Sequence, residues 1–141
     1  MEEIWKDIPD YDGYQVSNLG RIRTFNKITY TKKHGFRHWQ NRILKFKPSP
    51  PTKKSKQGVG YRVSLWKNGK CRDYLVARLV LSTFTGIDIN TKLTANHKDG
   101  NRLNNNINNL EWLTRADNIR YGFQHNQYPS AKSNKVYLKE K

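Results

Sequence analysis

The sequence predicts an α+β fold in which a small antiparallel β-sheet with a packed helix precedes a unit of two strands and a helix. Three observations indicate this. Two segments, 14–25 and 61–76, alternate between apolar and polar side chains, and apolar residues recur at helical spacing over 76–85. A strand–loop–strand–helix pattern then runs from 93 to about 122. A length of 141 residues fits one domain or two very small ones.

The first hairpin is expected over residues 14–25, where two alternating segments flank the turn residues Asn18-Leu19-Gly20. One face of this hairpin would be apolar, and the opposite face would present Arg21 and Arg23. Residues 26–42 are polar, basic and weakly patterned, which indicates a loop or an irregular strand.

A second strand region follows a linker. A strand is expected over 43–47, and the proline, serine and lysine content of 48–58 predicts a flexible segment. The next hairpin has Asn68-Gly69 at its centre, a pair that favours a type I′ turn because both residues must take positive φ. A helix over 76–85 would end at Gly86 and pack on the apolar face of this hairpin.

The last third of the chain is rich in asparagine and predicts a separate small unit. Strand candidates at 93–97 and 110–113 flank a long polar loop. Thr114 is a good N-cap for a helix over 115–122. Residues 125–141 predict a loose basic tail.

The charge of the chain points to a polyanionic partner. Lys and Arg number 27 against 11 Asp and Glu, which gives a formal net charge of +16. No acidic residue occurs between Gly13 and Arg72. Because a folded segment of one charge sign repels itself, a nucleic acid partner is favoured over a merely solvated basic face. The aromatic share of 12% argues against a disordered basic tail.

Several other classes are disfavoured by simple features. No apolar run approaches the roughly 18 residues that a membrane span needs, so we expect no membrane partner. The acidic start of the chain lacks the pattern of a signal peptide, and we expect a cytoplasmic, intracellular protein. The single cysteine, Cys71, excludes a disulfide framework and a Cys-rich zinc site.

A group of amide and imidazole side chains in the last unit could carry chemistry. His97 ends the first strand of this unit, Asn109 ends the loop, and Asn118 lies one turn into the helix. Together with Asn96, the group offers amide oxygens to one hard divalent cation. The imidazole could remove a proton from a water that attacks phosphorus. Taken alone, such residues are more often ordinary turn and loop residues.

The spacing closely resembles the signature of HNH endonucleases, in the branch of phage and group I intron homing endonucleases. The matching residues are Asn96 to Asn101, Asn104 to Asn106, Asn109 to Thr114 and Asn118, within a resemblance over 93 to about 124. Residues 3–9 and 13–23 resemble a nuclease-associated modular motif that often precedes HNH domains. Residues 61–85 resemble an AP2-like β-sheet element that binds DNA.

The resemblance implies a ββα-metal (His-Me finger) fold and a metal-dependent DNA endonuclease that nicks or breaks double-stranded DNA, leaving a 5′-phosphate and a 3′-hydroxyl. His97 would be the general base, and Asn96 and Asn118 the metal ligands. Asn109 would brace the loop and orient His97. One divalent ion is expected, Mg²⁺ or alternatively Mn²⁺, and no structural zinc. Many members carry Asp where this chain has Asn96, so its intrinsic Mg²⁺ affinity should be lower and should depend on DNA phosphate.

This interpretation divides the chain into a basic, β-rich DNA-binding region over 1–90, an HNH unit over 91–124 and the tail over 125–141. The expected partner is double-stranded DNA, bound by a monomer or a weak dimer. The side chains expected to contact DNA are Arg21, Arg23, Lys45, Lys47, Arg62, Ser64, Trp66, Lys67, Arg72, Arg115 and Arg120.

Two other function classes stay open on the sequence alone. A non-catalytic, AP2-like, sequence-specific DNA-binding protein with a decayed nuclease unit would explain the basic region equally well. Such a protein need not keep His97, Asn109 and Asn118 at the family spacing. An RNA-binding structural protein would suit the charge and the aromatic residues, but it requires nothing of the group at 96–118.

Overall fold

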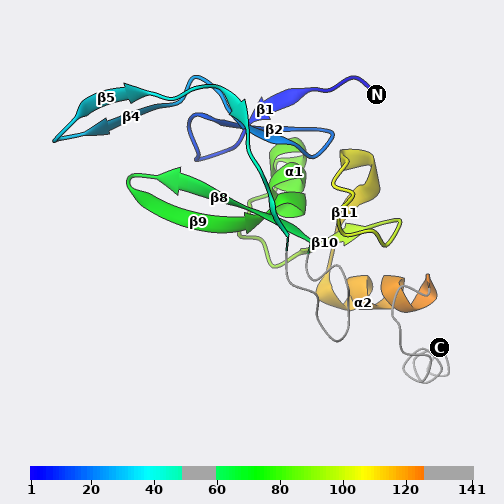
Figure 1. The fold of residues 1–141 in the computed structure, drawn as a ribbon. Coiled ribbons are helices and arrows are strands. Elements are labelled where there is room, and N and C mark those ends of the chain that lie inside the picture. Colours follow the sequence, from blue (N-terminus) through cyan, green and yellow to red (C-terminus); the bar gives the residue numbers. More distant parts are fainter. Residues whose placement is uncertain (49–59, 126–141) are drawn as a thin grey trace.

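The computed structural model describes residues 1–48 and 60–125, and its architecture is the α+β fold that the sequence predicts (Figure 1). The linker expected over 48–58 lies outside the described residues except for Pro48, and so does the tail from 126 onward. Neither α-helix within the described ranges is long and apolar enough to cross a membrane.

The first sheet has four antiparallel strands. In spatial order they are β1 (Trp5–Asp7), β2 (Tyr14–Ser17), β3 (Ile22–Thr24) and β6 (Arg42–Ile43). The alternation predicted for the hairpin is confirmed, since Tyr14, Val16 and Ile22 are buried while Arg21 is exposed.

The single strand expected over 43–47 is wrong. Residues Arg42–Ile43 pair with β3, whereas β7 (Lys47–Pro48) pairs with a strand of a different sheet. Between them Leu44 and Phe46 pack against the core. The chain therefore crosses from one sheet to the next here, and its apolar residues fill the core instead of forming a ladder.

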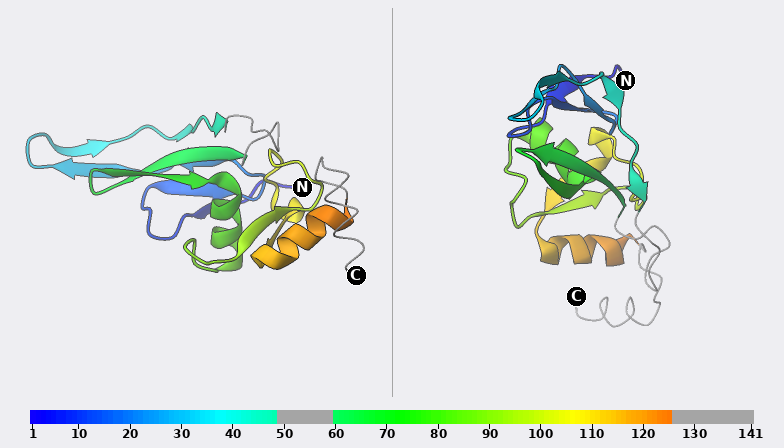
Figure 2. Two further views of the ribbon diagram at one scale, coloured as in Figure 1. Left: turned by 90° about the horizontal axis from the view of Figure 1, so that it is seen from below. Right: turned by 60° about the vertical axis from the view of Figure 1, so that its left-hand side comes forward.

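Residues 26–42 contain a regular hairpin where we expected a loop or an irregular strand. β4 (Ile28–Thr31) pairs with β5 (Gly35–His38), with Tyr30 opposite Phe36. The hairpin projects away from the body of the molecule (Figures 1 and 2). Most of its residues are exposed on both faces. Without a buried face it lacks the alternation that identifies a strand in a sequence.

The second hairpin and its helix follow the prediction. β8 (Tyr61–Lys67) pairs with β9 (Lys70–Leu75), and β7 adds to the other edge of β8. Asn68 and Gly69 take φ angles of 52° and 75°, as a type I′ turn requires. α1 (Val76–Thr85) ends at Gly86, whose φ is 80°.

The last unit consists of β10 (Thr94–His97), the 3₁₀ helix η1 (Ile107–Asn109), β11 (Leu110–Leu113) and α2 (Arg115–Gln124). β10 and β11 are antiparallel. Thr114 caps α2 by accepting a hydrogen bond from the backbone N–H of Asp117. α2 runs two residues beyond its expected end and lies on the side of the molecule away from the hairpin tips (Figure 2).

One hydrophobic core joins these parts. α1 lies at its centre and contacts β2, β8, β10 and β11. Val76, Leu79 and Val80 of this helix are buried together with Ile22 of the first sheet and Leu110 of β11. The N-terminal sheets and the last unit therefore pack on a common helix, which fixes their relative positions.

Candidate active site

His97 lies at the C-terminal end of β10 and is only 8% exposed. Its Nε2 is 2.8 Å from Oδ1 of Asn105. Because an amide oxygen only accepts hydrogen bonds, Nε2 must carry the ring proton, and the lone pair of Nδ1 is the basic one. Burial lowers the pKa of His97, and this outweighs the opposing effects of the Asn105 hydrogen bond and the Asp99 charge. The imidazole is therefore neutral at neutral pH and able to accept a proton.

Asn109, at the end of η1, holds the turn that follows His97. Its Oδ1 accepts from the backbone N–H of Asp99 at 3.0 Å, and its Nδ2 donates to Asp99 Oδ1 and to the Asn104 carbonyl at 2.9 Å each. Its own carbonyl accepts from the N–H of Lys98. The side chain thus braces the loop, whereas the imidazole of His97 donates its hydrogen bond to a different asparagine, Asn105.

Asp99 is the centre of this turn. Burial raises the pKa of its carboxyl, but hydrogen bonds from Asn104, Asn101 and Asn109 outweigh this and leave it below its ordinary value. The ionised carboxylate therefore stays available as the acceptor that closes the turn.

Asn96 and Asn118, the expected metal ligands, come from adjacent elements. Asn96 on β10 donates from Nδ2 to Glu111 Oε1 at 2.9 Å, and Asn118 on α2 donates from Nδ2 to Thr94 Oγ1 at 2.9 Å. Both bonds use the amide nitrogen, so in each residue the amide oxygen is the atom suited to a cation. Neither Glu111 nor Thr94 was singled out in the sequence.

The amide oxygens of Asn96 and Asn118 fit a hard divalent cation that keeps several of its bound waters. Amide oxygens are hard donors, and Mg²⁺ keeps several waters while binding substrate phosphate oxygens. Within residues 1–48 and 60–125, no cluster of three or more His, Cys, Asp or Glu side chains could hold a metal. An ion held by Asn96 and Asn118 would therefore draw its charge compensation largely from bound phosphate.

The side chains expected to contact DNA do not form a single surface. Arg62, Ser64 and Trp66 alternate with the buried residues of β8 and lie on its face away from α1. Lys67 and Arg72 belong to the opposite face, where their cations lie over tyrosine rings. Lys45, in the crossing between the sheets, and Arg115 and Arg120, on α2, are exposed.

The two arginines of the first sheet are already engaged. Arg21 forms an ion pair with Glu3, and the hydrogen bond from Arg21 holds the pKa of that carboxyl below its usual value. Arg23 lies 4.2 Å from the ring centre of Trp5 and 4.6 Å from that of Phe25. Neither cation is as available to a phosphate as its sequence context suggested.

A cation that was expected to contact DNA is also paired with an acid on the β7–β8–β9 sheet. Lys47 Nζ lies 2.6 Å from Ser64 Oγ and 3.5 Å from Asp73 Oδ1. Ser64 donates to Asp73, and this hydrogen bond, with the charge of Lys47, lowers the pKa of the Asp73 carboxyl. The outer face of the β8–β9 hairpin therefore carries an acid, Asp73 of β9, among its cations.

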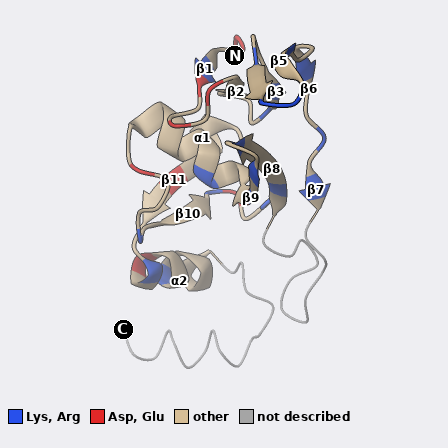
Figure 3. Ribbon diagram, turned by 90° about the vertical axis from the view of Figure 1, so that its left-hand side faces the viewer, with Lys and Arg blue, Asp and Glu red and all other residues tan. Residues whose placement is uncertain are grey.

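The β4–β5 hairpin is an exposed surface that was missed in the sequence. Tyr30 and Phe36 are 62% and 75% exposed, with ring centres 5.0 Å apart. On its other face the Arg37 guanidinium lies 3.8 Å from the ring centre of Trp39. Lys and Arg positions continue from this hairpin along β6, β7 and β8 (Figure 3). The signal was the run of exposed aromatic residues among cations in a segment without acids.

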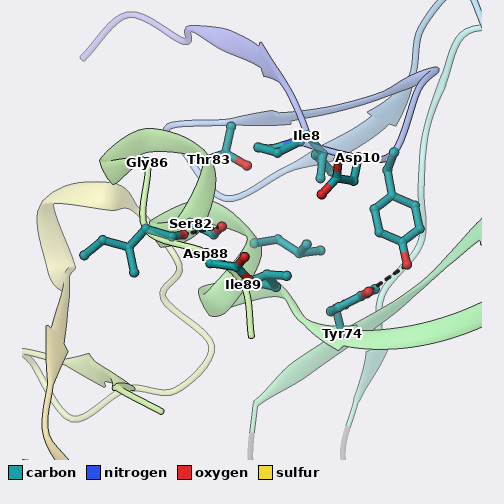
Figure 4. A pocket seen from close by; sticks show the side chains of 12 residues that line it. Ile8, Asp10, Tyr74, Ser82, Thr83, Gly86, Asp88 and Ile89 are labelled. Atoms are coloured by element: carbon teal, nitrogen blue, oxygen red, sulfur yellow. Dashed lines mark hydrogen bonds between the residues drawn. The ribbon is translucent and has the colours of Figure 1, made fainter. Parts of the chain in front are cut away.

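A hollow in the described part of the chain lies away from the residues of this site. It has a volume of about 210 Å³ and lies between the Pro9–Tyr11 turn, α1 and residues 86–89 (Figure 4). Asp10 and Asp88 line it, and the hydroxyls of Tyr11 and Tyr74 meet beside it at 2.6 Å. Burial and this hydrogen bond raise the pKa of Tyr11 to about 12. Two carboxylates make this hollow unsuitable for a phosphate.

Comparison with known protein families gives two matches. The family described as the NUMOD4 motif matches residues 3–48, and the family described as HNH endonuclease matches residues 74–120. The second match includes α1, β10, β11 and the part of α2 up to Arg120. The AP2-like character expected of 61–85 stays a prediction.

Individual proteins match over most of the chain. DNA endonuclease I-HmuI of Bacillus phage SP01 is 35% identical over 116 residues, which are 82% of this chain and 55% of that protein. An HNH endonuclease of Acanthamoeba polyphaga mimivirus is 36% identical over 122 residues, which are 86% of this chain and 30% of that protein. The chain thus spans about a third to about half of the length of these relatives.

A solved structure matches the fold as well. It is described as DNA binding and cleavage by the HNH homing endonuclease I-HmuI, and it superposes with a TM-score of 0.62 at 31% identity. The match covers 96% of this chain and 66% of that one.

Proposed function

The chain belongs to the HNH homing endonuclease family, and we propose that it is a metal-dependent endonuclease that hydrolyses phosphodiester bonds of double-stranded DNA. The observation that carries this proposal is the buried imidazole of His97, which is held in one tautomer, together with the two amides that hydrogen bonds orient on β10 and α2 of the same unit. A decayed nuclease unit would not require the side chains of His97, Asn96 and Asn118 to be held by hydrogen bonds.

His97 acts as the general base. Its Nδ1 takes a proton from the water whose oxygen forms a bond to phosphorus, while the bond to the 3′ oxygen breaks and that oxygen takes a proton from a second water. The products are a 5′-phosphate and a 3′-hydroxyl. Asn109 contributes by holding the turn after His97, so that the imidazole keeps its place while the bond is cut.

Asn96 and Asn118 would hold one divalent ion, for which we propose Mg²⁺, with Mn²⁺ as a substitute. When bound, the ion stabilises the negative charge that develops on the leaving oxygen. Because both protein ligands are neutral, the ion binds well only together with DNA phosphate.

DNA would lie against the hairpins and the outer face of β8. A two-stranded ribbon such as β4–β5 is of a size that the major groove admits, and we propose that the exposed Lys45 and the half-buried Arg62 contact phosphates. We propose that the protein works as a monomer or a weak dimer in the host cytoplasm.

The test is the conversion of supercoiled plasmid to open-circular or linear DNA in the presence of Mg²⁺. EDTA and the His97→Ala substitution should each prevent conversion. If Mn²⁺ and genomic DNA also give no cleavage while the protein binds DNA tightly, the chain is a non-catalytic DNA-binding protein.

A further inference from the structure

We propose that Asn105 is a positioning residue for His97, and that the N-terminal sheet holds Asn105 in place through the turn at Gly20. The inference rests on the proposed function, because it concerns the same general base. It assigns the hydrogen-bond partner of the imidazole to a residue other than Asn109, and it assigns part of the active site to the region expected only to bind DNA.

The contact between Asn105 and His97 is direct and buried. Nε2 of His97 donates to Oδ1 of Asn105 over 2.8 Å, and the two residues are 8% and 5% exposed. In a buried site this amide oxygen excludes the tautomer with the proton on Nδ1, because Nε2 and the amide oxygen would then both be acceptors. Asn105 thus keeps Nδ1 free of a proton and fixes the rotation of the ring.

Asn105 is in turn packed against the turn between β2 and β3. Gly20 has a φ of 89°, and a Cβ at this position would lie 2.8 Å from both Cβ and the carbonyl oxygen of Asn105. Real Cβ atoms do not approach other atoms so closely. Only glycine therefore lets this turn close on the Asn105 backbone.

A backbone hydrogen bond fixes the same contact. The carbonyl of Asn18 accepts from the N–H of Ile107 at 2.8 Å, two residues after Asn105. Asn18 is itself buried, accepting from the N–H of Ile4 at 2.7 Å and donating to the carbonyl of Glu2 at 2.9 Å. The loop that carries Asn105 is therefore attached to the first sheet and to the chain that leads into β1.

The decisive comparison uses Asn105→Leu, which keeps the branched skeleton of the side chain but removes the acceptor. Asn105→Asp keeps an acceptor oxygen, and Asn108→Ala is the matched control, since Asn108 lies exposed on η1 in the same loop. The probes are supercoiled plasmid with Mg²⁺ or Mn²⁺ for cleavage, and ¹⁵N–¹H correlation spectra of the histidine rings for the tautomer of the full-length protein without DNA.

We expect N105L to lower kcat about 10- to 100-fold, the usual cost of losing the partner of a functional histidine, with an unchanged KM for DNA. Its spectrum should lose the single Nε2–H form of His97. N105D should restore most of the cleavage and the Nε2–H form, and N108A should match the wild type. N105L with wild-type cleavage and an unchanged tautomer would overturn the proposal.

Gly20→Ala tests the second half independently. It should disturb the Nε2–H signal of His97 and lower kcat although Gly20 belongs to the other sheet. An unchanged His97 signal in G20A would refute the role of the turn. If the wild-type protein cleaves no DNA, the proposed function fails, and the tautomer spectra of N105L and G20A alone decide whether these residues position His97.

Discussion

The nuclease unit and the projecting hairpins use polar residues in opposite ways. Asn96, His97 and Asn105 are buried, and each makes a hydrogen bond to a side chain that fixes its orientation. The hairpins instead expose large side chains, such as Phe36 at 75% and Trp66 at 54%. Buried polar groups must be paired to be stable, whereas exposed cations and rings stay adaptable. We therefore expect the rate of cleavage and the affinity for DNA to depend on separate sets of residues.

The largest expected effect is on the rate. His97→Ala removes the general base and should lower the cleavage rate about 10²- to 10⁴-fold, as is usual for proton transfer by a positioned side chain. Affinity for the plasmid, measured by gel shift with Ca²⁺ in place of Mg²⁺, should change little. A parallel loss of affinity would show that His97 acts in binding.

A smaller effect is expected from Asn96→Asp. The added carboxylate should lower the Mg²⁺ concentration for half-maximal cleavage about tenfold, because ligand charge sets the affinity of such sites. It also loses the hydrogen bond to Glu111 and faces its carboxylate, so N96D should be less stable without metal and regain stability with Mg²⁺. Thermal melting with and without Mg²⁺ checks this, and an equal Mg²⁺ requirement for both proteins would argue against Asn96 as a ligand.

Substitution on the β4–β5 hairpin should lower DNA affinity and leave the cleavage rate unchanged, the opposite of His97→Ala. Phe36→Ser removes an exposed ring, so stability should stay within about 0.5 kcal/mol of the wild type. DNA affinity should fall several-fold while the single-turnover rate on saturating DNA stays the same. Unchanged affinity would remove this hairpin from the proposed DNA surface.

The smallest expected effect is on the salt dependence of DNA binding, and it should differ between Lys45 and Arg21. Lys45→Ala should reduce the slope of log K against log salt by about 0.9, the value for one phosphate contact. Arg21→Ala should reduce it less, because Arg21 is already paired with Glu3. Equal reductions would mean that this ion pair opens when DNA binds.

Much of this architecture could be predicted because buried apolar residues recur in the sequence at the spacing of a strand or a helix. Thr114 caps α2 at the position that the sequence indicates. α1 buries most of its apolar residues, and β8 has one buried face, with Val63 and Leu65 at alternate positions. The β4–β5 hairpin was missed because it has none. The ion pair between Arg21 and Glu3 depends on the pairing of β1 with β2, which no local pattern specifies.

The partner of His97 could not be predicted for a different reason. Asn104, Asn105 and Asn106 are adjacent and chemically identical, yet the first donates to Asp99, the second accepts from His97, and the third caps η1. The path of the backbone decides which partner each asparagine reaches. That path depends on the contact between Asn105 and Gly20 of the first sheet.

The most direct test of the account measures two quantities for two variants on one plasmid that the wild-type protein cleaves. For His97→Ala and Phe36→Ser, the single-turnover cleavage rate with Mg²⁺ and the dissociation constant with Ca²⁺ are compared with those of the wild type. We predict that His97→Ala lowers the cleavage rate and leaves the dissociation constant unchanged, and that Phe36→Ser raises the dissociation constant and leaves the rate unchanged. If rate and affinity fell together in both variants, the division between a positioned site and an adaptable surface would be contradicted.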